Sequence, residues 1–313
     1  MKLLIRAWLA FCALGMAQAM SAGPAGGDDS GYLFAYFKSG HQSRGDGLHL
    51  AWSRDGTTWK KLNHGRVYFK PRQGMFRDPF VLQGPDGIFR MTWTSAEKEI
   101  GYAQSSDLIN WTDEKYLPVM AHEPQARNCW APEMFYDDQK KQFLIFWSTT
   151  IPGKFPQTDP AGDQGYNHRI YYVTTKDFQT FSPTRLLFDP GFNCIDATML
   201  KAGSGYYMFL KNETLKPVKK FIVHAQAQSP EGPWGPVSEP LTPSWSEGPT
   251  VIKIGEQWFL YYDLYAKKKY GLSVSSDLIR WQDRSAQLKM PRGARHGCVL
   301  KVSGEFFSEL DKR

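Results

Sequence analysis

The segment Ser53-Arg54-Asp55-Gly56-Thr57-Thr58-Trp59 is the first of five copies of one short motif, in which an acidic residue follows a serine or lysine and an aromatic residue comes shortly afterwards. The other copies are Ser106-Asp107-Leu108-Ile109-Asn110-Trp111, Lys176-Asp177-Phe178-Gln179-Thr180-Phe181, Ser276-Asp277-Leu278-Ile279-Arg280-Trp281 and the degenerate Ser229-Pro230-Glu231-Gly232-Pro233-Trp234. An Asp or Ser side chain can accept hydrogen bonds from the backbone amides that follow it. Each copy therefore predicts a tight turn whose aromatic residue packs on the hairpin that it closes.

Two runs of β-branched and aromatic residues precede every turn, which predicts two strands per copy. The runs next to the turns cover residues 48–52, 100–104, 170–174, 222–226 and 270–274. The runs before those cover residues 32–37, 89–94, 143–148, 206–210 and 258–263. Almost no segment has the periodicity of an amphipathic helix. Five copies of a four-stranded antiparallel unit predict an all-β fold, a five-bladed β-propeller.

The two ends of the repeat array predict how the ring closes. The first copy begins at Tyr32 and lacks a leading strand, whereas a surplus strand over residues 297–302 follows the last copy. We therefore expect the C-terminal strand to complete the N-terminal blade. A β-sandwich with similar hairpins is the alternative, but it predicts neither five copies of one turn nor a missing strand that is replaced from the other end.

The N-terminal residues have the pattern of an export signal. Lys2 and Arg6 precede an apolar run over residues 7–16, and Ala17-Gln18-Ala19 is a small-x-small cleavage site. We expect a signal peptide over residues 1–19, a flexible segment rich in Gly, Ala, Asp and Ser over residues 20–30, and a single propeller domain over residues 31–313. The protein is then exported to the periplasm or the extracellular space, with no membrane span.

Composition narrows the classes of partner. The formal net charge is +7, but the basic residues are scattered, and the two short clusters Lys219-Lys220 and Lys267-Lys268-Lys269 have the pattern of solvated loops. No basic stripe or motif indicates nucleic-acid binding. After the leader, Cys129, Cys194 and Cys298 remain, an odd number without zinc-ligand spacing.

Acidic residues open the predicted innermost strand of several blades. The segments are Arg77-Asp78-Pro79-Phe80, Trp130-Ala131-Pro132-Glu133, Ile195-Asp196-Ala197-Thr198, Ser246-Glu247-Gly248-Pro249 and Arg295-His296-Gly297-Cys298. We take the equivalent positions to be Asp78, Glu133, Asp196, Glu247 and His296. Four carboxylates converging with an imidazole on one mouth of the channel repel one another, and such clusters are typical of functional sites.

A glycosidase needs two such carboxyl groups, one protonated as the acid and one ionised as the base or nucleophile. In an inverting enzyme the two carboxyl groups stand about 6.5–9.5 Å apart, which leaves room for a water molecule. Opposite sides of a propeller channel offer a separation of that kind.

The ordered set of motifs over residues 32–302, one per blade, resembles glycoside hydrolase family 43. The resemblance implies that the Asp-Pro aspartate, Asp78, is the general base, that the Glu-Gly-Pro glutamate, Glu247, is the general acid, and that Asp196 modulates the pKa of the acid and orients it. It also implies inversion and release of arabinofuranosyl, xylosyl or galactosyl units from plant polysaccharides. Two features depart from the family: Ala197 follows Asp196 where many relatives have Pro, and a blade precedes the one that holds Asp78.

Further residues are predicted to contact the substrate: Arg77, Trp130, Glu133, His168, Arg169, Arg295 and His296. Glu133 could bind sugar hydroxyls or pair with Arg127 or Arg295, and Trp130 could stack on a sugar or pack between blades. His296 could line the channel, bind water or help to hold a channel cation. No cofactor is required on this interpretation, although relatives make a structural Ca²⁺ in the channel one of the alternatives. The irregular insertion over residues 149–167 leads into His168 and is expected to shape a subsite.

Three other functions fit parts of the sequence. A non-catalytic carbohydrate-binding propeller has no need of Asp78, Asp196 and Glu247 together. A sialidase is suggested by the Asp-box-like segment from Ser53 to Trp59, but no arginine triad accompanies it. A retaining fructosidase-type propeller would need an Asn-Asp-Pro-Asn type of nucleophile motif, which the sequence lacks. The favoured function is an inverting glycosidase that acts on a carbohydrate substrate.

Overall fold

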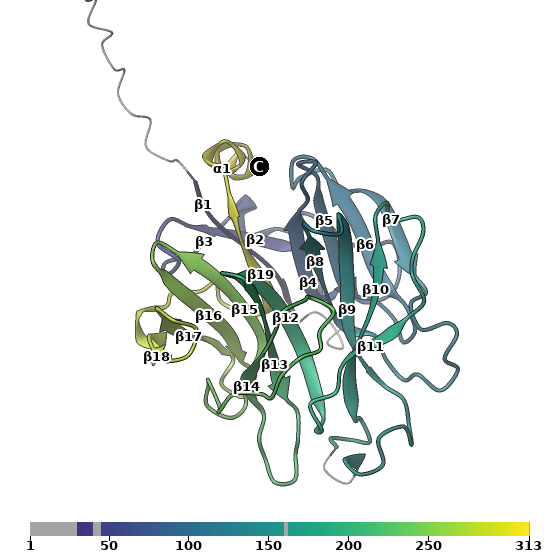
Figure 1. Cartoon of the computed structure of the whole chain (residues 1–313). Coiled ribbons are helices and arrows are strands. Elements are labelled where there is room, and N and C mark those ends of the chain that lie inside the picture. Colours follow the sequence, from purple (N-terminus) through teal and green to yellow (C-terminus); the bar gives the residue numbers. More distant parts are fainter. Residues whose placement is uncertain (1–29, 40–44, 160–161, 313) are drawn as a thin grey trace, which may run out of the picture.

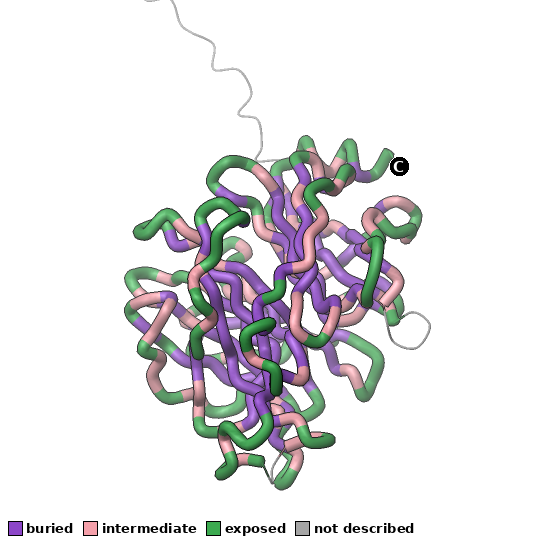
Figure 2. Tube along the Cα trace, turned by 90° about the vertical axis from the view of Figure 1, so that its right-hand side faces the viewer, coloured by how far each residue is buried: buried purple, intermediate pink, exposed green. Residues whose placement is uncertain are grey.

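The computed structural model describes residues 30–39, 45–159 and 162–312, and within them the chain forms five antiparallel sheets around a central axis (Figure 1). The predicted signal peptide over residues 1–19 and most of the predicted segment 20–30 lie outside the described residues. Figure 2 shows that the buried stretches run through the middle of the molecule and that exposed loops surround them.

The five sheets are the blades of the propeller, and each blade starts with the strand nearest the axis. From the axis outward, blade 1 contains β19 (Ala294–Val302), β1 (Gly31–Lys38), β2 (His49–Ser53) and β3 (Lys60–Lys61). Blade 2 contains β4 (Arg77–Gln83), β5 (Phe89–Thr94), β6 (Ile100–Ser105) and β7 (Thr112–Leu117). Blade 3 contains β8 (Trp130–Asp137), β9 (Gln142–Thr150), β10 (His168–Thr175) and β11 (Arg185–Phe188).

Blade 4 contains β12 (Cys194–Ala202), β13 (Gly205–Asn212) and β14 (Phe221–Ala227). Blade 5 contains β15 (Glu247–Ile254), β16 (Gln257–Leu264), β17 (Lys269–Ser275) and β18 (Gln282–Asp283). The described helices are η2 (Asn63–Gly65), η4 (Tyr265–Lys267), η5 (Ser285–Gln287) and α1 (Gly304–Asp311).

The ring closes as the sequence predicts. β19 pairs antiparallel with β1, with Tyr32 opposite Lys301 and Phe34 opposite Val299. The five inner strands contact one another in the cyclic order β19, β4, β8, β12, β15. The five-bladed propeller and its closure by the C-terminal strand are therefore confirmed.

The repeated turn has the local structure that its sequence predicts. In the first copy, Asp55 Oδ1 accepts hydrogen bonds from the amides of Thr57 and Thr58 at 2.7 and 2.8 Å. The indole of Trp59 then donates to the carbonyl of Gly56 at 3.1 Å. The three other undegenerate copies repeat the pair of amide bonds to their aspartate, namely Asp107, Asp177 and Asp277.

Blade 4 departs from the four-stranded pattern because proline interrupts its outer segment. Residues 235–241 run beside β14, and the amides of Gly235, Ser238 and Leu241 donate to carbonyls of that strand. Pro236 and Pro240 have no amide hydrogen, so the ladder is incomplete and no regular fourth strand forms.

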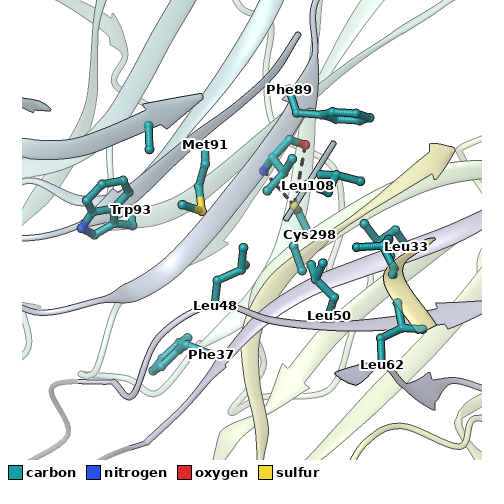
Figure 3. Close-up of a cluster of buried hydrophobic side chains, with 14 of the residues drawn as sticks. Leu33, Phe37, Leu48, Leu50, Leu62, Phe89, Met91, Trp93, Leu108 and Cys298 are labelled. Carbon is teal, nitrogen blue, oxygen red and sulfur yellow. Dashed lines mark hydrogen bonds between the residues drawn. The ribbon is translucent and has the colours of Figure 1, made fainter. Parts of the chain in front are cut away.

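The core between blades 1 and 2 is a cluster of buried aliphatic and aromatic side chains (Figure 3). Cys298 of β19 lies within it, and its sulfur accepts a hydrogen bond from the amide of Val81 at 3.1 Å. Cys129, Cys194 and Cys298 are all buried free thiols.

The C-terminal helix α1 is not predicted from the sequence. It has only eight residues, and no side chain caps its first turn. Its buried Leu310 belongs to the core of blades 1 and 2. Phe306 lies edge-on to Phe89 of blade 2, and Phe307 lies 5.5 Å from Trp52 of blade 1. The helix therefore seals the junction between the first two blades.

Candidate active site

All five inner strands have a β-bulge near their start. The register shifts just after Arg77 in β4, Trp130 in β8, Ile195 in β12, Glu247 in β15 and Arg295 in β19. In four of these strands the next residue has a left-handed φ, namely 51° at Asp78, 47° at Ala131, 56° at Asp196 and 55° at Gly248. Aspartate tolerates this conformation better than most residues with a side chain, and a bulge of this kind re-aims the side chains beside it.

The bulges correct the expected equivalence of the five acidic and imidazole positions. The residues in the same place of the bulge are Asp78, Ala131, Asp196, Gly248 and His296, which confirms the expected equivalence of Asp78, Asp196 and His296. Glu247 stands one residue earlier, and Glu133 lies two residues further along its strand. The expected equivalence is therefore wrong for Glu247 and Glu133, because it aligns the segments on their acidic residue, whereas Pro79, Pro132 and Pro249 stand at matching positions of their bulges.

The mouth of the channel holds a small pocket of about 120 Å³ on the axis. It is lined by Arg77, Asp78, Trp130, Ile195, Asp196, Lys211, Glu213, Glu247 and His296. The structure thus gathers Asp78, Asp196 and Glu247 in one place, together with three of the predicted contact residues. A larger apolar groove over Leu117, Val173 and Phe181 on the outer surface holds no ionisable pair and is remote from this chemistry.

Asp78 is held in its ionised form. Its Oδ2 accepts a hydrogen bond from the hydroxyl of Thr94 at 2.7 Å, and its Oδ1 lies 3.4 Å from Nδ1 of His296. Burial alone would raise the pKa of Asp78, but the Arg77 guanidinium, the His296 ring and the Thr94 hydroxyl hold it well below its usual range.

Asp196 has the opposite tendency. Burial, with the charges of Glu247 and Asp78, raises the pKa of Asp196 to about 6, although His296 and Lys211 act against this. Its Oδ2 accepts a hydrogen bond from the amide of Gly248 at 3.1 Å. Asp196 therefore fixes the backbone directly beside Glu247.

His296 lies between the two aspartates. Its Nδ1 is 3.4 Å from Asp78 and 3.8 Å from Asp196. Burial alone would lower the pKa of His296, but Asp196 and Asp78 outweigh it and raise that pKa to about 9. A Cβ on Gly248 would lie 2.5 Å from Cγ of this ring, so only glycine fits at that position.

Glu247 is held by two cations. Its Oε1 accepts from Nη2 of Arg295 at 3.0 Å, and its Oε2 accepts from Nζ of Lys211 at 3.2 Å. Each cation is shared with another carboxylate, because Arg295 also binds Asp263 at 2.7 Å and Lys211 lies 2.6 Å from Glu213. The two cations therefore fix the orientation of the Glu247 carboxylate, and each of them also pairs with a second carboxylate.

The series of ion pairs that begins at Glu247 and Lys211 extends to the irregular insertion over residues 149–167. Glu213 lies 2.5 Å from Lys220, and Lys220 lies 2.6 Å from Asp163 of the segment after β9. The solvated loop expected for Lys219-Lys220 is wrong at Lys220, whose side chain is 2% exposed. Sequence reasoning missed Lys211, Glu213 and Asp263. The charged Lys211-Asn212-Glu213 segment at the end of an apolar strand was the available signal.

Glu133 lies deeper in the channel than expected and does not line the pocket. Burial raises its pKa to about 8, and Thr198 is its hydrogen-bond partner. Its Oε2 has no hydrogen-bond partner among the described residues. No ion pair joins it to Arg127 or Arg295 within the described part of the chain.

The two predicted contact residues of β10 are buried behind the pocket. His168 packs beside Trp130 with ring centroids 5.4 Å apart, and its Nδ1 meets the hydroxyl of Thr150 at 2.9 Å. Burial lowers the pKa of His168 to about 3, so the ring is neutral. Arg169 is fully buried and pairs with Asp189, away from the pocket lining.

The channel cation considered for the place beside His296 stays a prediction. Nδ1 of His296 lies 3.4 Å from Asp78 and 3.8 Å from Asp196. Among the residues that the structure describes, no group of three or more His, Cys, Asp or Glu side chains is placed to bind a metal ion. Over the same residues, no helix has the length and apolar character needed to cross a bilayer.

A five-bladed propeller with an axial pocket of four carboxylates, two of them in opposed electrostatic surroundings, defines a glycoside hydrolase of the propeller class. A family model described as "Probable glycosyl hydrolase domain" matches residues 28–307. The chain belongs to this family, which is related to glycoside hydrolase family 43.

Individual relatives agree with this placement. An alpha-L-arabinofuranosidase of Bifidobacterium longum subsp. longum is 25% identical over 277 residues, which cover 73% of this chain. The chain spans about a quarter of that relative, since the match covers 25% of its length.

Solved structures share the fold. A thermostable family-43 glycoside hydrolase has a TM-score of 0.58 at 20% identity, with 76% of this chain and 84% of that chain covered. The alpha-L-arabinofuranosidase from Lactobacillus brevis has a TM-score of 0.55 at 20% identity, with 70% and 75% covered. The endo-arabinase from Bacteroides thetaiotaomicron VPI-5482 has a TM-score of 0.54 at 13% identity, with 73% and 93% covered.

Proposed function

We propose that the protein is an inverting glycoside hydrolase that releases a terminal arabinofuranosyl, galactosyl or xylosyl unit from a plant-type polysaccharide or oligosaccharide. Asp78 is the general base, Glu247 is the general acid, and Asp196 modulates and positions the acid. The observation that carries the proposal is the contrast between carboxyl groups within one pocket: Asp78 is stabilised as an anion, whereas the pKa of Asp196 is raised to about 6.

The proposed reaction uses the two sides of the pocket. Asp78 takes a proton from a water molecule as its oxygen attacks the anomeric carbon. Glu247 gives a proton to the leaving glycosidic oxygen, so that the bond to the rest of the substrate breaks without release of an alkoxide. Arg295 and Lys211 orient Glu247, and the bond from Gly248 to Asp196 fixes its backbone.

Position in the ring supports inversion. Asp78 is on β4 and Glu247 is on β15, and these strands are not neighbours, because β19 lies between them on the shorter side. That arrangement favours the wider separation of an inverting pair over the roughly 5–5.5 Å of a retaining pair.

The test is a panel of aryl arabinofuranosides, xylosides and galactosides, with the anomer of the first-formed product read by NMR. We expect one substrate class to be hydrolysed and its product to have the opposite anomeric configuration. A product with the substrate's own configuration would rule out inversion. Specific binding of a sugar with no hydrolysis of any panel member would instead support the alternative, a non-catalytic carbohydrate-binding propeller.

We also propose that the chain is exported and that cleavage follows Ala19. The support is the basic, apolar and small-residue pattern of residues 1–19. Mass spectrometry of the mature protein from its native host tests this, because an N-terminus at Met1 would contradict export by this signal.

A further inference from the structure

A second hollow lies directly beside the axial pocket. Its volume is about 390 Å³, and it shares the side chain of Trp130 with the pocket as a common wall. Its other walls include Met75, Glu97, Arg127 and Tyr166. We propose that this hollow is a second sugar subsite, which holds the unit on the leaving side of the bond that is cleaved.

The hollow and the pocket open on the same mouth of the propeller. Met75 shortly precedes β4, whose Arg77 pairs with Thr94 at the end of β5, and Glu97 comes just after that end. Arg127 precedes β8 in the same way. The segment with Tyr166 leads into β10, whose first residue pairs with the last residue of β9.

The inference rests on the proposed function, because that function determines which sugar unit is adjacent to the one in the axial pocket. If a terminal unit occupies the axial pocket, its only covalent neighbour is the unit on the leaving side. Trp130 is in contact with both spaces. A chain that extends from the pocket across Trp130 therefore enters the hollow.

The chemistry of the walls suits a sugar ring. Trp130 and Tyr166 lie with ring centroids 4.7 Å apart, and their planes are tilted by 40°. A sugar presents C–H groups on its faces and hydroxyls at its edge, so aromatic walls with a few polar groups can bind both. Arg127 and Glu97 supply a donor and an acceptor at the rim.

The aromatic wall is held in place before any ligand binds. The Arg127 guanidinium lies 4.2 Å from the centroid of Tyr166, and its Nη1 donates to the carbonyl of Gly165 at 2.6 Å. The amide of Tyr166 donates to the carbonyl of Asp163 at 2.8 Å, and Asp163 is paired with buried Lys220. A preorganised wall reduces the entropy that binding would otherwise cost.

The experiment compares two substrates of the sugar that the panel identifies: a glycosyl fluoride, whose leaving group is one atom, and an unlabelled oligosaccharide. Tyr166→Ala is expected to lower kcat/KM on the oligosaccharide about tenfold, the scale of one lost aromatic contact, with kcat/KM on the fluoride within twofold of wild type. Tyr166→Phe keeps the ring and is the matched control, so it should behave as wild type on both substrates.

A second variant tests the space itself. Met75→Trp places bulk in the hollow and should raise KM for the oligosaccharide while the fluoride is hydrolysed normally. Equal losses on both substrates in Tyr166→Ala and Met75→Trp, or no loss on either, would overturn the subsite and leave the proposed function standing. A wild-type protein that hydrolyses no glycoside, fluoride included, would overturn both.

Discussion

Asp78 and Asp196 occupy the same place in two bulges, yet their environments make them different acids. Both are buried and both have a left-handed φ. The Arg77 guanidinium, His296 and the Thr94 hydroxyl favour the anion of Asp78, whereas Asp196 faces burial and two neighbouring carboxylates. The backbone conformation supplies the position, and the neighbours decide the role.

Asp78 and Glu247 are the two groups proposed to transfer protons. Asp78→Asn and Glu247→Gln should each lower kcat by about 10²–10⁴-fold, since general acid–base groups contribute that much. The amides keep the shape of the side chains but cannot transfer the proton, and Tm should change little. Residual activity above a tenth of wild type in either variant, measured as kcat on the panel substrate, would show that its assigned role is wrong.

The charge of Asp196 should affect the pH dependence of kcat/KM. Asp196→Asn keeps an oxygen for the amide of Gly248 but removes a negative charge beside Glu247. A negative charge opposes the formation of a second one nearby, so its removal should move the basic limb of kcat/KM to lower pH. The neighbouring charges of His296, Lys211 and Asp78 are present in the wild type and in Asp196→Asn alike, so they do not account for a difference between the two profiles. Lower activity with an unmoved basic limb would make Asp196 a purely positional group.

At the scale of single residues, the sequence predicts identities better than environments. The carboxylates of the pocket could be found because each stands in a short local motif. Lys211 and Asp263 could not be placed, because Lys211 reaches Glu247, and Asp263 reaches Arg295, across the junction between two blades. Arg169 shows the converse: its sequence position beside His168 gives no sign that it is buried against Asp189.

At the scale of the element, the bulge at the start of each inner strand is the recurring device. It re-aims the side chains at the start of β4, β8, β12, β15 and β19 without ending the ladder. The strands and turns of the blades could be predicted because alternation and turn chemistry are local. The bulges could not, because they arise where each inner strand pairs with the next strand; an alignment on acidic residues therefore misplaces Glu133 and Glu247 along their strands.

Gly248 provides the test of the bulge. Gly248→Ala would push a methyl group to 2.5 Å from Cγ of His296, so it should lower both Tm and kcat. Gly255→Ala is the matched control: its φ is also positive, 57°, but nothing lies within 4 Å of the added Cβ. The control should cost only the backbone strain, about 1–2 kcal/mol, and leave kcat unchanged. Equal effects of the two variants, measured by thermal melts and kcat, would mean that contact with His296 is unimportant.

At the scale of the whole molecule, the pocket exists only when the ring is closed. Asp78, Trp130, Asp196 and Glu247 come from four successive blades, and His296 comes from the closing strand β19. Closure could be predicted because a missing strand at one end and a surplus strand at the other are visible in the sequence. The helix α1 could not, since it is stabilised by contacts with blades 1 and 2 instead of by its own caps.

The helix α1 should contribute to the stability of the fold without affecting catalysis. It follows the end of β19, whereas the pocket lies at the start of that strand, about 25 Å away at the usual rise per residue. Leu310→Ala should therefore cost about 2–5 kcal/mol and lower Tm, while kcat below the melting range stays at the wild-type value. Ile279→Ala, at a side chain that is 65% exposed, is the control and should change neither. A large loss of kcat in folded Leu310→Ala would mean that the two faces are coupled.

The pairing of β1 with β19 also sets an order of events during biosynthesis. At ribosomal rates of about 5–20 residues per second, roughly 13–50 s separate the synthesis of the first strand from that of its partner. Throughout that interval the inner edge of β1 is an unpaired strand edge, which invites association with other chains. The blade that holds β1 can therefore be completed only after residue 302 has emerged.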